Sequence, residues 1–173
     1  SLYLLTKGAV IAPDSGGYLT MSSYRSLGYP LFLKAYHFFF QDSYGVLVAI
    51  QVSIGVLAID YFVRTLARYF PLSCFLHMMI FLFLFAPYFV IHGIGNYVLT
   101  EALCYPLFFM MLSFLIKTLK NNKTQSLSVA IGFALLLTLT RSQFIFLWPG
   151  LFILITYLFY KEGSLRSFLG RLL

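Results

Sequence analysis

Three side chains that could do chemistry stand at the ends of apolar stretches in this chain. Asp14 lies in the turn-forming segment PDSGG, Glu101 follows Thr100 where an apolar run begins, and Arg141 interrupts a later apolar run. A carboxylate within hydrogen-bond reach can act as a general base, and an arginine can clamp a phosphate. Each also has a structural explanation. Asp14 could cap a helix, Glu101 could favour a helix dipole, and Arg141 could anchor at a membrane surface.

Other polar side chains add weaker candidates. Arg25 and Lys34 could bind an anionic ligand, although contact with lipid headgroups would explain both. His37 and His92 could join Asp14 in a metal site, but no metal-ligand spacing supports one. The sequence therefore requires no cofactor and leaves a divalent metal open, with Asp14 and His37 as candidate ligands.

The composition decides which elements must position these groups. The 173 residues are 61% hydrophobic, 20% aromatic and only 10% charged, whereas soluble domains carry about 25% charged residues. We therefore expect an all-α fold, a polytopic transmembrane helix bundle. A membrane-spanning helix needs roughly 20 apolar residues, and suitable runs cover 44–63, 72–90, 98–116, 125–140 and 143–160. The last two result from dividing one long run at Arg141, because the segment RSQ and Pro149 break it.

The chain divides into three regions. Residues 1–43 are expected to form an outer-face loop with short interfacial amphipathic helices at SGGYLTMSSY and YPLFLKAYHFFF, and residues 44–160 the transmembrane helices. Residues 161–173 are expected to form an amphipathic segment at the cytoplasmic membrane surface. Neither the start at Ser1 nor the end at SFLGRLL reads as a natural terminus, so we expect a fragment of a longer protein.

The distribution of cations predicts the orientation. With five alternating spans, one side holds Arg64, Arg68, Lys117, Lys120, Lys123, Lys161, Arg166 and Arg171. The other side holds Lys7, Arg25, Lys34 and Arg141, together with Asp14, Asp42, His37, His92, Asn96 and Glu101. The positive-inside rule makes the first side cytoplasmic and the second periplasmic, extracellular or lumenal. Polar groups at membrane depth are costly and tend to be functional, so their gathering on one side predicts chemistry or binding at the outer surface.

Asp60 and Arg64 are explained differently. They stand four residues apart near the cytoplasmic end of the first span, and we expect an i,i+4 ion pair. The net charge of +7 reflects cations at the ends of apolar runs, which is typical of membrane orientation and not of a nucleic-acid partner.

Four segments stand in order along most of the chain: PDSGGYLTMSSY, LGYPLFLKAYHFF, APYFVIHGIGNYVLTEALCYPLFFMML and IGFALLLTLTRSQFIFLWPGLF. Together they resemble the GT-C superfamily of polytopic glycosyltransferases, of the protein mannosyltransferase and aminoarabinose transferase type. Two features depart from the family pattern. Leu27 stands where a proline often precedes the glycine, and the family's first span and C-terminal spans are missing.

The resemblance implies a membrane transferase that moves a sugar from a polyprenyl-phosphate donor to an acceptor hydroxyl on the outer face. By this resemblance Asp14 is the general base or a metal ligand, Glu101 is the later acidic position, and Arg141 lies near the donor phosphate. The remaining substrate-binding candidates are Tyr18, Arg25, Lys34 and His92. The expected partners are the lipid-linked donor, membrane lipid and an acceptor that is a protein, lipid or glycan, with no nucleic acid.

Two other functions remain open from the sequence. A polytopic transporter or flippase for a lipid-linked or small substrate should place charges or broken helices near the bilayer midplane. A non-catalytic membrane scaffold would leave the polar groups on the outer side unexplained. The deep parts of the predicted spans are nearly free of ionisable groups, which favours chemistry at the surface.

Overall fold

The computed structural model describes residues 26–40, 44–88, 100–121 and 124–162, and the regular structure of these residues is entirely helical. Its elements are α3 (Gly28–Phe40), α4 (Tyr44–Tyr69), α5 (Cys74–Phe85), the 3-10 helix η1 (Ala86–Tyr88), α6 (Glu101–Asn121), α7 (Thr124–Thr140), the 3-10 helix η3 (Ser142–Phe146) and α8 (Leu147–Glu162). The prediction of an all-α fold is confirmed for this part of the chain.

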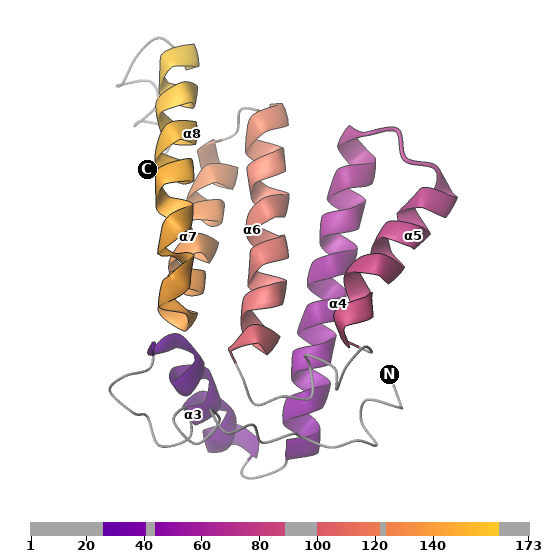
Figure 1. Cartoon of the computed structure of the whole chain (residues 1–173), viewed down its shortest axis with the longest axis vertical. Coiled ribbons are helices and arrows are strands. Elements are labelled where there is room, and N and C mark those ends of the chain that lie inside the picture. The colour runs from indigo at the N-terminus through magenta and orange to yellow at the C-terminus, as the bar shows by residue number, and fades with distance from the viewer. Residues whose placement is uncertain (1–25, 41–43, 89–99, 122–123, 163–173) are drawn as a thin grey trace.

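The helices α4 to α8 run alternately in opposite directions, and α3 lies across one end of them (Figure 1). In the centre α6 packs against α4 on one side and α7 on the other. α5 packs on α4, α8 packs on α7 and η3, and α3 contacts the end of α7. The turns at residues 70–73 and 141 therefore join neighbouring helices, as the sequence predicts.

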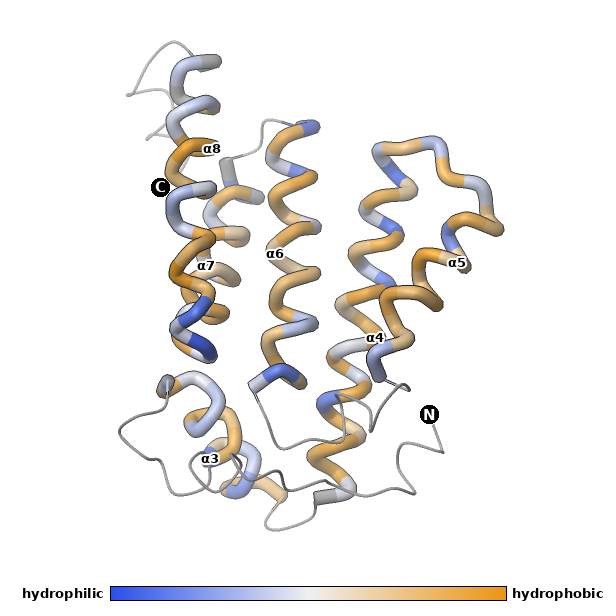
Figure 2. The backbone as a smooth tube through the Cα atoms, in the orientation of Figure 1, coloured by the Kyte–Doolittle hydropathy of each residue, from blue (hydrophilic) through white to orange (hydrophobic). Residues whose placement is uncertain are grey.

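Two helical segments are long and apolar enough to cross a membrane, Gly45–Tyr69 and Glu101–Asn121. The other apolar helices, Cys74–Tyr88, Gln125–Thr140 and Ser142–Leu158, have fewer than 18 residues. Hydrophobic residues nevertheless predominate along α4, α5 and α6 (Figure 2). Their side chains also cover much of the outside: Phe83 of α5 is 78% exposed and Phe152 of α8 is 71% exposed. Apolar surface of this kind marks a membrane or protein contact.

The ends of the helices have identifiable causes. The break predicted from residue 64 is wrong, because α4 continues to Tyr69. The basic residues there do not interrupt a helix, whereas Pro71 cannot continue one. Arg64 Nε lies 2.8 Å from Asp60 Oδ2, so the predicted i,i+4 ion pair is confirmed. The predicted break at Pro149 is also wrong, because this proline lies in the first turn of α8, where its missing N–H leaves no bond unmade.

One core cluster fills the space between α4, α5 and α6. Tyr88 is fully buried there and its ring stacks on Phe85, with centroids 5.1 Å apart. The ring lies in a notch at Gly55, where an added Cβ would come within 2.0 Å of the tyrosine oxygen. That oxygen has no hydrogen-bond partner in the described part of the chain. A second cluster joins α6 to α7 and α8 through Met111, Leu137 and other apolar residues.

Strongly hydrophilic residues, blue in Figure 2, occur at both ends of the helices. At the end where α4 finishes, Lys117 Nζ donates to the Tyr61 hydroxyl and lies 4.3 Å from the centre of that ring. At the same end Asn121 Nδ2 donates to the Tyr69 hydroxyl over 2.6 Å. Glu101 and Arg141 lie at the opposite end, where α6 begins and α7 finishes. Lys117 thus lies at the opposite end of the helices from Glu101 and Arg141, in agreement with the cation count. The side of a membrane that each end faces stays a prediction.

Candidate functional site

The helix start at Glu101 fixes the carboxylate of the site. The carbonyl oxygen of Thr100 accepts hydrogen bonds from the backbone N–H groups of Leu103 and Cys104, at 3.1 and 2.8 Å, and these bonds begin α6. The Thr100 hydroxyl donates to Glu101 Oε2 over 3.2 Å. Because Thr100 is buried, this contact orients the carboxylate at the end of the helix. A negative charge is also favourable there, next to the positive end of the helix dipole.

Arg141 occupies the turn between α7 and η3. Its N–H still bonds to the Leu137 carbonyl over 2.8 Å, which completes α7. Its own backbone is extended, with φ −150° and ψ 113°, so the chain changes direction here. The turn predicted at this residue is confirmed. The change of direction brings the arginine side chain alongside the start of α6.

Arg141 and Glu101 form an ion pair between Nη1 and Oε1, across 40 positions of sequence. The Arg141 side chain is 36% exposed and the Glu101 side chain 43% exposed. An ion pair with this much solvent contact contributes about 0.2–1 kcal/mol to stability. It therefore holds the two groups together without preventing a ligand from separating them.

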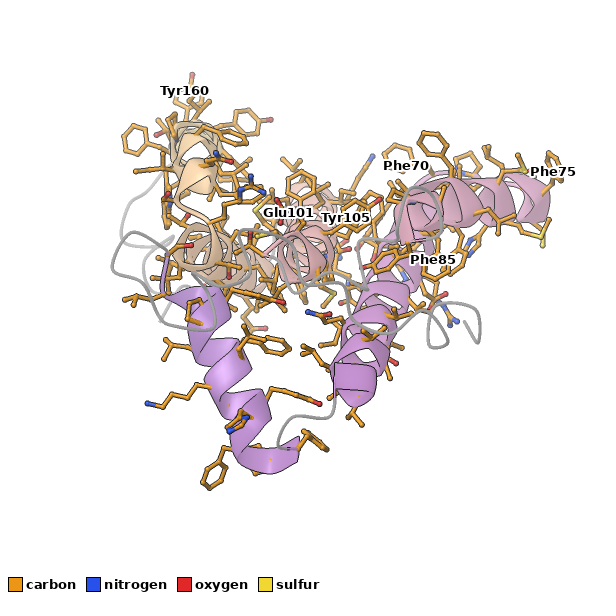
Figure 3. All side chains as sticks on the ribbon, turned by 60° about the horizontal axis from the view of Figure 1, so that its bottom comes forward. Phe70, Phe75, Phe85, Glu101, Tyr105 and Tyr160 are labelled. Atoms are coloured by element: carbon orange, nitrogen blue, oxygen red, sulfur yellow. The ribbon has the colours of Figure 1, made fainter. Side chains whose placement is uncertain are left out.

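A cavity of about 510 Å³ opens beside this ion pair. Glu101, Cys104, Tyr105 and Phe108 line it from one face of α6, and Arg141, Gln143, Phe144 and Phe146 line it from the turn after α7. Figure 3 shows Glu101 and Tyr105 next to each other on α6. Ligand sites are commonly of this volume, mostly apolar with a few placed polar groups. This cavity has an aromatic wall with a carboxylate, a guanidinium and an amide.

Helix α3 is attached directly beside the site. The Ser26 hydroxyl donates to the carbonyl of Thr140, the residue before Arg141. Gly28 lies so close that an added Cβ would be 2.8 Å from the Thr140 N and Cα atoms. The other side of α3 is held by Gln51 of α4, whose Nε2 donates to the Tyr29 hydroxyl over 2.9 Å in the interior. The position of α3 is thus coupled to the end of α7.

The remaining predicted site residues divide into two groups. Lys34 and His37 are exposed on α3 and do not line the cavity. Asp14, Tyr18, Arg25 and His92 lie outside the described residues. Within the described residues no group of three or more His, Cys, Asp or Glu side chains could hold a metal ion.

The aromatic residues that line the cavity are not among the site residues predicted from the sequence. Tyr105 and Phe108 follow Glu101 at intervals of four and seven residues, the spacing of one helix face. That spacing could have identified them. No sequence signal places Phe144 and Phe146 opposite them, because the contact depends on how α6 packs against α7.

Comparison with protein-family models, with curated proteins and with solved structures finds no match to this chain. The function is therefore inferred from the geometry of this end of the helices and from the resemblance to GT-C enzymes.

Proposed function

We propose that this chain belongs to a multi-pass membrane glycosyltransferase that moves a sugar from a polyprenyl-phosphate donor to an acceptor hydroxyl. The observation that carries the proposal is the pairing of Arg141 with Glu101 at the rim of an aromatic cavity, at one end of the helices. An amphiphilic phosphate needs a cation beside an apolar surface, and this end of the molecule offers both. The resemblance to GT-C enzymes supplies the reaction.

The proposed membrane arrangement extends the two long apolar helices to a polytopic bundle. Figure 3 shows Phe75 of α5 and Tyr160 of α8 pointing away from the packed helices. Such side chains suit a lipid environment, in which the shorter helices would lie beside α4 and α6. The cavity end would then face the periplasm, the cell exterior or an organelle lumen, as the positive-inside rule predicts.

In the proposed reaction the acceptor hydroxyl attacks C1 of the sugar and gives its proton to a carboxylate, while the bond from C1 to the phosphate oxygen breaks. The lipid phosphate leaves with the negative charge that develops on that oxygen. Arg141 would stabilise this charge, the role that a preorganised cation plays in many transfer reactions. The aromatic wall would receive the apolar part of the donor. The resemblance assigns the base to Asp14, which lies outside the described residues.

The placement of charge favours this reaction over transport. A transporter should hold ions or substrate near the middle of its spans. In α4 the charged side chains are confined to the last three turns, and in α6 to the first turn and the last turns. The first four turns of α4 and the middle of α6 therefore carry no charged side chain, and the candidate chemistry stands at one end.

The proposal is tested by transfer of radiolabelled sugar from polyprenyl-phosphate donors in membranes that contain the full-length protein. Replacement of the proposed base, Asp14→Asn, should lower transfer about 10²- to 10⁴-fold, because that is the usual contribution of a general base. Asp60→Asn is the matched control, since Asp60 pairs with Arg64 away from the cavity. Unchanged transfer by a folded Asp14→Asn protein would remove Asp14 from the mechanism.

A further inference from the structure

We infer that Glu101 makes the cavity select a sugar-bearing lipid phosphate over the bare lipid phosphate. The inference rests on the proposed function. The resemblance makes Glu101 only the later acidic position of the family, and the inference gives this residue a role in donor specificity. It follows from three features of the site: the ion pair, the Thr100 contact and the aromatic wall.

The first step is a competition for Arg141. Glu101 Oε1 occupies Nη1 of the guanidinium in the free protein. A phosphate binds a guanidinium best with two parallel N–H donors, so a phosphate that takes the edge of Arg141 facing Glu101 displaces the carboxylate. Because the ion pair is partly exposed, its replacement by a phosphate costs little free energy.

The second step concerns the displaced carboxylate. Glu101 Oε2 still accepts from the Thr100 hydroxyl, but Oε1 has lost its partner. The neighbouring cavity wall is largely aromatic, from Tyr105, Phe108, Phe144 and Phe146. Sugar hydroxyls next to the phosphate would donate to this oxygen. A bare lipid phosphate has no such donors, so it leaves the carboxylate with water alone.

The same exchange gives a route for product release. Once the sugar has been transferred, the bound lipid phosphate no longer offers hydroxyls to Glu101. The carboxylate then competes again for Arg141 and favours release of the lipid phosphate. A single acidic residue would thus favour the donor before transfer and disfavour the product afterwards.

The test measures binding of two probes to the protein in lipid nanodiscs: farnesyl phosphate, and farnesyl phosphate carrying mannose, glucose or aminoarabinose. We expect the wild type to bind at least one glycosylated probe about tenfold more tightly than the bare probe, the scale of a hydrogen bond to a charged group. In Glu101→Ala this preference should fall below about twofold. Bare farnesyl phosphate should also bind about 1.5- to fivefold more tightly, because an exposed competing ion pair is removed.

Glu101→Gln removes the charge and keeps the shape, so it tests the competition even where the alanine variant does not fold. Asp60→Asn is the matched control and should leave both affinities unchanged. Weaker binding of the bare probe by Glu101→Gln would overturn the inference, as would equal wild-type affinities for the bare probe and all three glycosylated probes. Arg141→Gln distinguishes failure of the role inferred for Glu101 from failure of the proposed function. If it leaves farnesyl phosphate binding unchanged, the proposed function itself is wrong.

Discussion

Replacement of Gly28 by alanine should disturb the site from a distance. The added Cβ would lie 2.8 Å from the backbone N and Cα of Thr140, whereas ordinary contacts begin near 3.4 Å. The obstacle is backbone, which cannot rotate away as a side chain can. Helix α3 and the end of α7 must therefore separate by about 0.6 Å to restore an ordinary contact.

The size of the effect follows from this separation. Overpacking of a close contact costs about 1–3 kcal/mol, and weakening of the Ser26–Thr140 hydrogen bond adds up to about 1 kcal/mol. The higher helix propensity of alanine offsets up to about 1 kcal/mol. We expect the free energy of unfolding to fall by about 1–3 kcal/mol. Because a misplacement of 1 Å can cost about 10²-fold in rate, the shift beside Arg141 should lower sugar transfer about tenfold.

Thermal unfolding followed by circular dichroism measures the first effect, and transfer of labelled sugar measures the second. The matched control is Gly45→Ala in the first turn of α4, where an added Cβ would meet nothing within 4 Å. It should raise stability by up to about 1 kcal/mol, through the helix propensity of alanine, and leave transfer unchanged. If Gly28→Ala behaves like Gly45→Ala in both assays, α3 does not touch α7 as described, and the reasoning about this joint is refuted.

The remaining predictions concern individual side chains. Tyr88→Phe should leave the thermal stability unchanged or raise it, because it removes a buried hydroxyl without a described partner. Tyr105→Phe should lower the free energy of unfolding by about 0.5–1.5 kcal/mol, because it removes the 2.6 Å hydrogen bond from the Tyr105 hydroxyl to the Leu84 carbonyl. Asp60→Asn should change the free energy of unfolding by about 0.5 kcal/mol or less, as expected for an i,i+4 pair. A membrane-permeant maleimide should modify the exposed Cys74 faster than the buried Cys104. Farnesyl phosphate should slow only the Cys104 reaction, because Cys104 lines the cavity. Equal protection of both cysteines would contradict a ligand in the cavity.

The sequence predicts local features of this molecule well. The start of α6 near Glu101, the turn at Arg141 and the Asp60–Arg64 pair depend on residues within one or two turns of each other. Apolar runs and polar interruptions report such features directly. The end of α4 was missed because a basic segment can continue a helix until Pro71 stops it.

Contacts between helices could not be predicted in the same way. The sequence indicates that Glu101 and Arg141 share one end of the helices, but their ion pair depends on the register in which α6 packs against α7. The cavity and the close approach of Gly28 to Thr140 have the same origin. These features arise from side-chain packing between elements, which periodicity within one element does not encode. The roles assigned to Asp14, Tyr18, Arg25 and His92 stay predictions.

The most direct test of the central claim compares two arginines in the sugar-transfer assay. Both Arg141 and Arg64 form an ion pair with a carboxylate, but only Arg141 lines the cavity. Arg141→Gln should lower transfer from the polyprenyl-phosphate donor by about 10²-fold or more, because it removes the cation that stabilises the leaving phosphate. Arg64→Gln should transfer at the wild-type rate. Wild-type transfer by a folded Arg141→Gln protein would contradict the assignment of this cavity as the donor site.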